Sequence, residues 1–390
     1  MYISRTAEKI LKEYATSFKS VAVIGPRQSG KTTLIRHVFP LKPYVNLENP
    51  DTREFAATDP RRFLNGYPDG AILDEVQKVP VLFSYLQQIL DEKAERGLFI
   101  LSGSTHFLMM EHLAQTLAGR IGLIKLLPMS IKEAEQTEHV SRTPDDAMIQ
   151  GGYPEICVNG VSPLHWLGSY INTYIERDVR QLLNVHDTGN FFKFVKLCAG
   201  NVGSLLNLSR LGADCGIDQK TARAWIGILE TSFIVYRLMP HHNNFRKRLI
   251  KTPKLYFYDT GLACRLLGIE SSVQLSTNLM RGHLFENMVI SDLLKQRFNQ
   301  GLDDNIYFWR SSSGHEVDVI IDKAGKLFPV EIKSGVTIAK DWFTGLLKWK
   351  KLASDQSGTL QLLYGGTDLQ KRGEVNVVSW RHIEQLLLEE

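Results

Sequence analysis

Residues 25–33 constrain the fold of this chain more than any other part of its 390-residue sequence. They read Gly-Pro-Arg-Gln-Ser-Gly-Lys-Thr-Thr and follow the short apolar run Val-Ala-Val-Ile at 21–24. The spacing of a glycine, four residues and Gly-Lys-Thr, between an expected strand and an expected helix, is typical of a phosphate-binding loop. Backbone N–H groups in such a loop surround phosphate oxygens at a helix N-terminus, whose dipole favours anions. The segment therefore predicts a parallel α/β sheet that binds a nucleotide at the end of a strand.

Individual residues of this loop have separate expected roles. Lys31 should reach the β and γ phosphates of ATP, and the hydroxyl of Thr32 should bind Mg²⁺. A glycine-rich turn with a chance lysine is the alternative, but it does not account for the strand-to-helix context. The predicted ATP-binding residues of the loop are Gly25, Pro26, Arg27, Gln28, Ser29, Gly30, Lys31, Thr32 and Thr33.

Two later strands are expected to complete the nucleotide site. Residues 70–75 form an apolar run that ends in Asp74 and Glu75. We expect Asp74 to hold Mg²⁺, usually through water, and Glu75 to polarise the water that attacks the γ-phosphate. A further apolar run at 98–101 leads to Ser104, which we predict to be a γ-phosphate sensor. The alternative for Ser104 is a helix cap.

Arginines after the predicted sheet are candidates for action on a neighbouring subunit. Arg120 precedes the apolar run 121–126, and an arginine there would stabilise transition-state charge on the neighbour's nucleotide. Arg177 is a second candidate for this catalytic role. For both residues the alternative is an ordinary surface or ion-paired arginine.

Hydrophobic periodicity divides the chain into three expected domains. Short apolar strands alternate with helical patterns from 21 to 130, which predicts a parallel α/β sheet and an ATPase domain over 1–135. The stretch 135–146 is polar and is the expected linker. Mainly helical patterns predict a helical and winged-helix domain over 136–250. Strands return after 253, so the third domain, over 251–390, is expected to be α/β.

Composition excludes several classes of protein. The apolar fraction of 43% and the charged fraction of 23% are those of a globular protein. A net charge of only +4 means that nucleic-acid binding has to come from local patches. The four cysteines lie far apart, which argues against zinc ribbons and disulfide frameworks. No signal-peptide pattern and no uncharged apolar run of roughly 20 residues is visible, so we expect a cytoplasmic protein without membrane association.

The middle domain contains the outline of a helix-turn-helix. Residues 208–216 predict a short helix closed by glycine, and Asp218 is the expected N-cap of a second helix over 219–230. An apolar strand at 233–238 and the cations Arg246, Lys247, Arg248, Lys251 and Lys254 would form a β wing that meets DNA phosphates. Gln219, Lys220 and Arg223 would then face the major groove. The alternative is a protein–protein module.

The C-terminal domain carries polar residues on otherwise apolar elements. Glu286 lies in a helical run, Asp318 interrupts an expected strand, and Glu331 and Lys333 share one face of the next strand. We expect Glu286, Asp318 and Glu331 to bind a divalent metal through oxygens. The ion would activate water for phosphodiester cleavage, and Lys333 would orient that water. The alternative is a structural ion pair between Lys333 and one of the carboxylates.

In these motifs the chain resembles prokaryotic ATP-binding proteins of the AAA superfamily that end in an uncharacterised C-terminal region. The order of Glu286, Asp318, Glu331 and Lys333 is similar to that of restriction-endonuclease-like domains. Residues 309–314, before Asp318, look like those of archaeal-type Holliday-junction resolvases. The segments that carry the resemblance are 25–33, 73–77, 101–104, 117–120, 152–154, 174–178, 258–262 and 330–335.

The resemblance implies a homo-oligomeric ring ATPase, with a hexamer as the expected form, that uses ATP and Mg²⁺. We expect a DNA-associated motor or switch coupled to a metal-dependent nuclease-like domain, with branched DNA such as Holliday junctions among its substrates. One alternative is an ATP-dependent switch or chaperone-like protein whose C-terminal fold does not cut. A second alternative is a nucleotide-regulated DNA-binding regulator that uses the helix-turn-helix alone.

Overall fold

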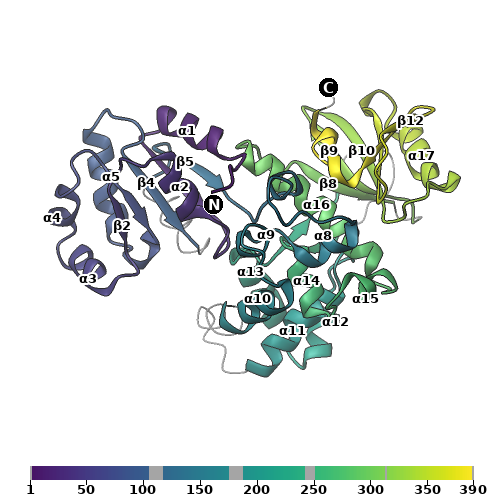
Figure 1. The fold of residues 1–390 in the computed structure, drawn as a ribbon, viewed down its shortest axis with the longest axis horizontal. Helices are drawn as coiled ribbons and strands as arrows, with labels where there is room; N and C mark the ends of the chain where they lie inside the picture. The colour runs from purple at the N-terminus through teal and green to yellow at the C-terminus, as the bar shows by residue number, and fades with distance from the viewer. Residues whose placement is uncertain (1, 105–116, 175–187, 242–250, 312–313, 389–390) are drawn as a thin grey trace. The chain divides into compact units, whose positions relative to one another are not determined.

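The computed structural model describes residues 2–104, 117–174, 188–241, 251–311 and 314–388. These residues form two compact units (Figure 1). Unit 1 comprises Met1–Met129, Thr231–Phe233 and Arg297–Asp303. Unit 2 comprises Ser130–Glu230, Ile234–Gln296 and Asp304–Glu390, so the middle and C-terminal parts of the chain share one unit. The three-domain division stays a prediction.

Unit 1 is built on the parallel sheet that the sequence predicts. Its strand order is β2-β3-β4-β1-β5, and every neighbouring pair is parallel. Because β4 lies between β1 and β3, the carboxyl ends of these three strands are neighbours at one edge of the sheet. The strands are β1 (Ser20–Ile24), β2 (Tyr44–Asn46), β3 (Ile72–Asp74), β4 (Phe99–Gly103) and β5 (Ile121–Lys125).

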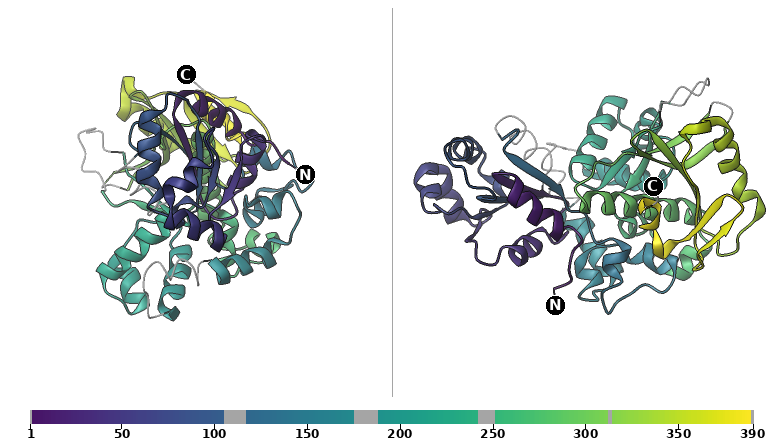
Figure 2. Two further views of the ribbon diagram at one scale, coloured as in Figure 1. Left: turned by 90° about the vertical axis from the view of Figure 1, so that its left-hand side faces the viewer. Right: turned by 90° about the horizontal axis from the view of Figure 1, so that it is seen from above.

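Helices cover both faces of this sheet (Figure 2). One face packs Val21, Val23 and Ile100 against Leu11 of α1 and Leu34 of α2 in a buried apolar cluster. Residues that alternate with these along the strands, such as Ala22, Leu73 and Leu101, are also fully buried, as expected for strands that are covered on both sides. The helices are α1 (Glu8–Ser17), α2 (Lys31–Val38), α3 (Pro50–Thr58), α4 (Pro60–Asn65) and α5 (Leu82–Glu92), with the short 3₁₀ helix η1 (Val76–Lys78).

The helical half of unit 2 contains the predicted helix pair. α12 (Leu208–Cys215) ends at Gly216, and α13 (Gln219–Thr231) follows after a tight turn. The Asp218 carboxylate accepts the Thr221 backbone N–H at 2.9 Å, which confirms the predicted N-cap. The other helices are α7 (Ile131–Ala134), α8 (Pro144–Gln150), α9 (Pro154–Cys157), α10 (Pro163–Tyr170), α11 (Thr188–Gly200), α14 (Thr260–Leu266), α15 (Ser272–Ser276) and α16 (Arg281–Asn299).

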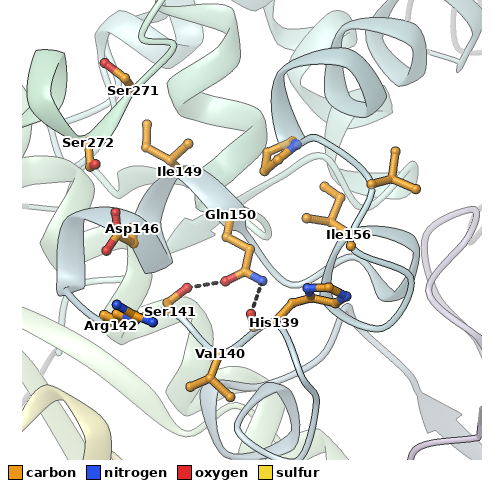
Figure 3. A pocket seen from close by; sticks show the side chains of 13 residues that line it. His139, Val140, Ser141, Arg142, Asp146, Ile149, Gln150, Ile156, Ser271 and Ser272 are labelled. Carbon is orange, nitrogen blue, oxygen red and sulfur yellow. Dashed lines mark hydrogen bonds between the residues drawn. The ribbon is translucent and has the colours of Figure 1, made fainter.

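The polar segment at 135–146, which is predicted to be a linker, belongs to unit 2 and makes hydrogen bonds within it. The Gln150 amide on α8 accepts from the Ser141 hydroxyl and donates to the His139 carbonyl at 2.7 Å (Figure 3). Arg381 donates to Glu135 at 3.1 Å and to the Ser141 carbonyl at 2.9 Å. Partners far along the chain therefore satisfy some of these polar groups, and the linker interpretation stays a prediction. The segment borders an open pocket of about 480 Å³ between α8, α9 and α15.

A two-stranded antiparallel sheet joins β6 (Val235–Leu238) to β7 (Lys254–Phe257) where the wing was predicted. Arg246, Lys247 and Arg248 lie outside the described residues, as does Arg177. Lys254 was predicted to meet DNA phosphates, but its exposed fraction is 4%. That prediction is wrong, because Lys254 makes buried ion pairs within unit 2.

The C-terminal half of unit 2 is a six-stranded sheet in the order β12-β13-β11-β10-β9-β8. β9 and β10 form the predicted hairpin, and Gly325 in its turn has a φ of 87°, a value that favours glycine. α17 packs on this sheet through Leu346 and Trp349. The elements are β8 (Ile306–Arg310), β9 (Glu316–Lys323), β10 (Lys326–Lys333), α17 (Thr344–Ala353), β11 (Leu360–Tyr364), β12 (Gln370–Arg372), β13 (Val375–Ser379) and α18 (Gln385–Leu388), with 3₁₀ helices η3 (Lys340–Phe343), η4 (Ser354–Gln356) and η5 (Trp380–His382). Within the described ranges, no helix is long and apolar enough to cross a membrane.

Candidate nucleotide and metal sites

The phosphate loop begins at Gly25, directly after β1, and leads into α2. A Cβ on Gly25 would stand 2.0 Å from the carbonyl oxygen of Leu126, so only glycine fits this close approach of two backbones. Lys31 is 6% exposed, and its Nζ donates to the carbonyls of Gly25 at 3.0 Å and Pro26 at 2.7 Å. Burial lowers the pKa of Lys31 to about 8, although the Glu75 and Asp74 carboxylates oppose this effect. The lysine is therefore held inside the loop that it is predicted to serve.

Asp74 ends β3 and lies beside the first turn of α2. Its Oδ2 accepts from the Thr32 hydroxyl at 3.0 Å and from the Tyr44 hydroxyl at 2.6 Å, and its Oδ1 accepts from the Ser102 hydroxyl. The structure thus brings together the two predicted Mg²⁺ ligands of this site, Thr32 and Asp74. An oxygen donor set of this kind fits Mg²⁺, which uses one or two protein oxygens together with water and substrate phosphates.

Sequence reasoning missed Tyr44 as a partner of Asp74. Burial, and then the hydrogen bond to Asp74, raise the pKa of the Tyr44 phenol well above its usual value. The Tyr44 hydroxyl therefore stays a donor to the carboxylate. Tyr44 lies on β2, which pairs with β3, and this pairing brings it close to Asp74. The sequence does not show which strands pair, so the contact could not be predicted.

Glu75 adopts an unusual backbone conformation, with a φ of 55°. For a non-glycine residue this left-handed conformation costs about 1–3 kcal/mol and is common at functional sites. Its Oε2 accepts from the Ser104 hydroxyl at 2.9 Å and from the Gln77 amide at 2.5 Å. The predicted water-activating carboxylate and the predicted sensor are thus directly bonded, although their catalytic roles stay predictions.

Arg120 follows a gap in the described residues and precedes β5. Its guanidinium binds both carboxylate oxygens of Asp91, at 2.5 and 3.0 Å. This is the ion-paired geometry that the sequence left open as the alternative. The predicted action of Arg120 on a neighbouring subunit stays a prediction.

Arg5 was not predicted as a residue of the nucleotide site. This residue is 5% exposed, and its guanidinium donates to the carbonyl of Ser29 at 2.9 Å and to that of Leu127 at 2.8 Å. Arg5 therefore connects the phosphate loop to the segment that follows β5. A charged donor to two carbonyls stabilises both segments more than a neutral donor would.

A second site lies on β9 and β10. Val330 on β10 pairs with Val319 on β9, and Glu331 and Asp318 are the residues that directly adjoin this pair on the two strands. The Asp318 carboxylate accepts the Ile332 backbone N–H at 2.8 Å. Glu331 Oε1 pairs with Lys333 Nζ at 2.6 Å, whereas Glu331 Oε2 is buried and has no hydrogen-bond partner among the described residues. The structure thus brings together three of the predicted residues.

Electrostatics at this second site are unfavourable for two ionised carboxylates. Burial, and then the Asp318 charge, raise the pKa of Glu331, and the nearby Lys333 ammonium lowers it again. Burial, and then the Glu286 charge, raise the pKa of Asp318. One lysine does not fully compensate two neighbouring carboxylates in a partly buried position.

Glu286 makes its direct contacts with residues of β7. Its Oε1 accepts from Lys254 Nζ at 2.9 Å and from the Tyr256 hydroxyl at 2.5 Å. Lys254 also binds Glu316 at 2.5 Å. Across the described part of the chain, no three His, Cys, Asp or Glu side chains are grouped so that they could hold a metal ion. The three predicted metal ligands Glu286, Asp318 and Glu331 are therefore not a ready-made three-ligand site.

Comparison with known families defines the class of the first unit. Residues 17–135 match a family model described as an AAA domain, and this match agrees with the phosphate loop and the parallel sheet. The chain therefore contains a P-loop ATPase domain of the AAA type. Residues 141–273 match a domain of unknown function (DUF8612), and residues 281–383 match another (DUF4143).

Relatives that match over most of their length define the family. The chain is 30% identical over 318 residues to the uncharacterized proteins Rv2008c of Mycobacterium tuberculosis and Mb2031c of Mycobacterium bovis, a match that covers 80% of this chain and 70% of each relative. The chain belongs to the family of these mycobacterial proteins. A solved Walker-type ATPase of Pyrococcus abyssi is similar at 14% identity and a TM-score of 0.46, covering 67% of this chain and 94% of that chain.

Proposed function

We propose that this protein hydrolyses ATP in unit 1 and uses the nucleotide state to control a metal-dependent phosphodiester-cleaving site on β9 and β10. The observation that carries the second half of this proposal is the buried Oε2 of Glu331, which has no hydrogen-bond partner in the described structure. An unsatisfied buried carboxylate oxygen is costly, and a bound cation would remove that cost.

The ATPase half follows from the residues at the strand ends. Lys31 exchanges its two carbonyl contacts for the β and γ phosphates, while Glu75 accepts a proton from the attacking water. Thr32 and Asp74 hold Mg²⁺, which when bound neutralises charge on the phosphates. Ser104 donates to Glu75 Oε2 and would sense the γ-phosphate beside this carboxylate.

The cleavage half uses three residues. Asp318 and Glu331 supply oxygens for a divalent cation, and the rest of its ligands come from water and a substrate phosphate, as Mg²⁺ prefers. The cation, when bound, activates water and stabilises the leaving oxygen. Lys333 is paired with Glu331 at 2.6 Å. When Glu331 binds the cation, the Lys333 ammonium would be released from this pair and would orient the attacking water.

DNA is the proposed partner, and α13 supports this proposal. Gln219, Lys220 and Arg223 are all exposed on the first turns of the second helix of the helix-turn-helix pair. Two cations near a helix N-terminus suit contact with base edges and phosphates. We further propose a homo-oligomer, with a ring as the expected form.

A second candidate is a nucleotide switch whose C-terminal sheet does not cut. The contact that favours it is the Lys333–Glu331 ion pair, because a purely structural pair explains two of the three charges. In that case Asp318 and Glu331 stabilise the fold, and breaking a buried pair on one side costs about 3–5 kcal/mol.

Calorimetric titration of the protein with Mn²⁺ separates these candidates. Incubation of the protein with Mg²⁺ and duplex, single-stranded or four-way-junction DNA then tests for cleavage. A Thr32→Ala, Asp74→Asn background removes the proposed metal ligands of the nucleotide site from the titration. The proposal expects binding that disappears in Asp318→Asn but persists in Asp341→Asn, a matched control at an exposed position. If the wild type binds no Mn²⁺ at this site even with DNA present, the cleavage half is wrong.

A further inference from the structure

A segment of unit 1 that the chemistry above does not use lies against the phosphate loop. It precedes α1 and contains Arg5, which is 5% exposed. Nη1 of Arg5 donates to the carbonyl of Ser29 in the loop at 2.9 Å, and Nη2 donates to the carbonyl of Leu127, after β5, at 2.8 Å. Because the guanidinium is a rigid planar fork, these two contacts fix the loop carbonyl relative to the segment that follows the sheet.

The Ser29 carbonyl shares a peptide bond with the N–H of Gly30. A trans peptide bond is planar, so its C=O and N–H point in opposite directions. A donor that holds the Ser29 carbonyl toward Arg5 therefore turns the Gly30 N–H away from Arg5. Gly30 is the N-cap of α2, and the first N–H groups of a helix have no partner within that helix. In a phosphate loop these N–H groups bind the phosphate oxygens.

Local chain preferences alone do not fix the orientation of this peptide bond. Gly30 has a φ of 92°, and glycine adopts positive and negative φ about equally readily, so the peptide bond before it turns at little cost. The Ser29 hydroxyl is buried and has no hydrogen-bond partner among the described residues. The Ser29 N–H makes a long contact of 3.4 Å with the Pro26 carbonyl. The charged donor of Arg5 is therefore a strong constraint on this peptide bond.

The backbone of Arg5 is itself held in place. Oε1 of Glu8, in the first turn of α1, accepts the backbone N–H of Arg5 at 3.1 Å. The same oxygen accepts from the hydroxyls of Ser4 at 2.7 Å and Tyr2 at 2.8 Å. The Tyr2 ring stacks on His37 of α2, with the ring centroids 3.7 Å apart. The segment is thus attached to both α1 and α2, and the guanidinium reaches the loop from a fixed position.

We propose that Arg5 is a positioning residue for nucleotide binding. By holding the Ser29 carbonyl, it keeps the Gly30 N–H turned toward the phosphates of a nucleoside diphosphate or triphosphate. Arg5 acts through the loop and does not touch the nucleotide. This inference rests on nucleotide binding at 25–33, which is the first half of the proposed function, and is independent of the cleavage half.

Calorimetric titration of the full chain with ADP and Mg²⁺ tests this proposal in Arg5→Met, with the melting temperature measured on the same samples. Methionine keeps an unbranched stem but donates to neither carbonyl, so the dissociation constant for ADP should rise roughly tenfold, the effect of one lost hydrogen bond to a charged group.

Lys42→Met is the matched control. Lys42 Nζ also donates to two carbonyls of unit 1, those of Leu98 at 3.0 Å and Asp69 at 3.4 Å. These carbonyls precede β4 and β3, so they lie at the amino ends of the strands, away from the phosphate loop. Lys42→Met should lower the melting temperature but keep the wild-type affinity for ADP.

Arg5→Lys provides a second, milder variant. Lysine keeps the charge but lacks the planar fork that spans the two carbonyls, so ADP binding should weaken at least about threefold. Wild-type ADP affinity in Arg5→Met, or in Arg5→Lys if only that variant folds, would overturn the proposal. An equal loss of affinity in Lys42→Met would also overturn it, because ADP binding would then follow the stability of unit 1. A wild type that binds no ADP removes the nucleotide function and this inference with it.

Discussion

The hydroxyl of Ser104 donates a 2.9 Å hydrogen bond to Oε2 of Glu75, and this bond joins the ends of β4 and β3. Glu75 is also held by Gln77 and has a left-handed backbone conformation. The carboxylate is therefore fixed by its neighbours before a nucleotide arrives. A general base that is already held in position requires less reorganisation free energy to reach the transition state than a mobile one does.

Ser104→Ala should slow ATP hydrolysis and leave ATP binding close to normal. The variant removes one hydrogen bond to a charged group, so we expect kcat to fall roughly tenfold. Steady-state hydrolysis and equilibrium binding of a fluorescent ATP analogue measure the two effects. Equal losses in binding and in kcat/KM, with kcat unchanged, would mean that Ser104 stabilises the bound ground state and the transition state equally, and does not act in the chemical step.

Glu75→Gln and Lys31→Ala should fail at different steps. Glu75→Gln keeps the phosphate contacts but removes the base, so it should bind ATP and hydrolyse it at least about a hundredfold more slowly. Lys31→Ala removes the charge that meets the phosphates, so it should lose both binding and turnover. Filter binding with labelled ATP distinguishes the two variants. Turnover at the wild-type rate in Glu75→Gln contradicts the role assigned to Glu75.

Arg120→Ala tests action between subunits, and Asp91→Asn is its matched control because Asp91 is the residue that Arg120 contacts. If Arg120 reaches a neighbouring nucleotide, Arg120→Ala should slow hydrolysis in the assembled protein, whereas Asp91→Asn should not. Mixing Arg120→Ala with Lys31→Ala subunits should then restore part of the activity. Equal effects of Arg120→Ala and Asp91→Asn, with no rescue at any ratio, would show that the ion pair is only structural.

The sequence predicted the parts of the molecule that depend on local pattern. Glycine spacing after an apolar strand predicted the loop at 25–33. Asp74 and Glu75 were correctly predicted at the carboxyl end of an apolar strand, which is β3. The hairpin between Asp318 and Glu331 was predicted correctly because its turn residues lie between two apolar runs. The N-cap at Asp218 was likewise visible in the sequence.

Residues whose environment depends on distant segments were not predictable. Lys254 was predicted to be a surface cation beside a basic run. It is instead buried and forms ion pairs with Glu286 and Glu316, which lie far from it in the sequence. Arg5 reads as an ordinary charge near the N-terminus, although its partners are the Ser29 and Leu127 carbonyls. Periodicity reports the face on which a residue lies and not the partner that it meets there.

In the proposed function, the nucleotide bound in unit 1 controls cleavage at Asp318 and Glu331. The most direct test is the initial rate of Mg²⁺-dependent cleavage of a four-way DNA junction by Glu75→Gln, with ATP bound and without nucleotide. Asp318→Asn in the same background sets the zero of the measurement. We expect a cleavage rate that requires Asp318 and differs roughly tenfold between the ATP-bound and nucleotide-free states, which corresponds to a coupling free energy of about 1.4 kcal/mol. Cleavage at one rate in both states, or no cleavage that depends on Asp318, would contradict it.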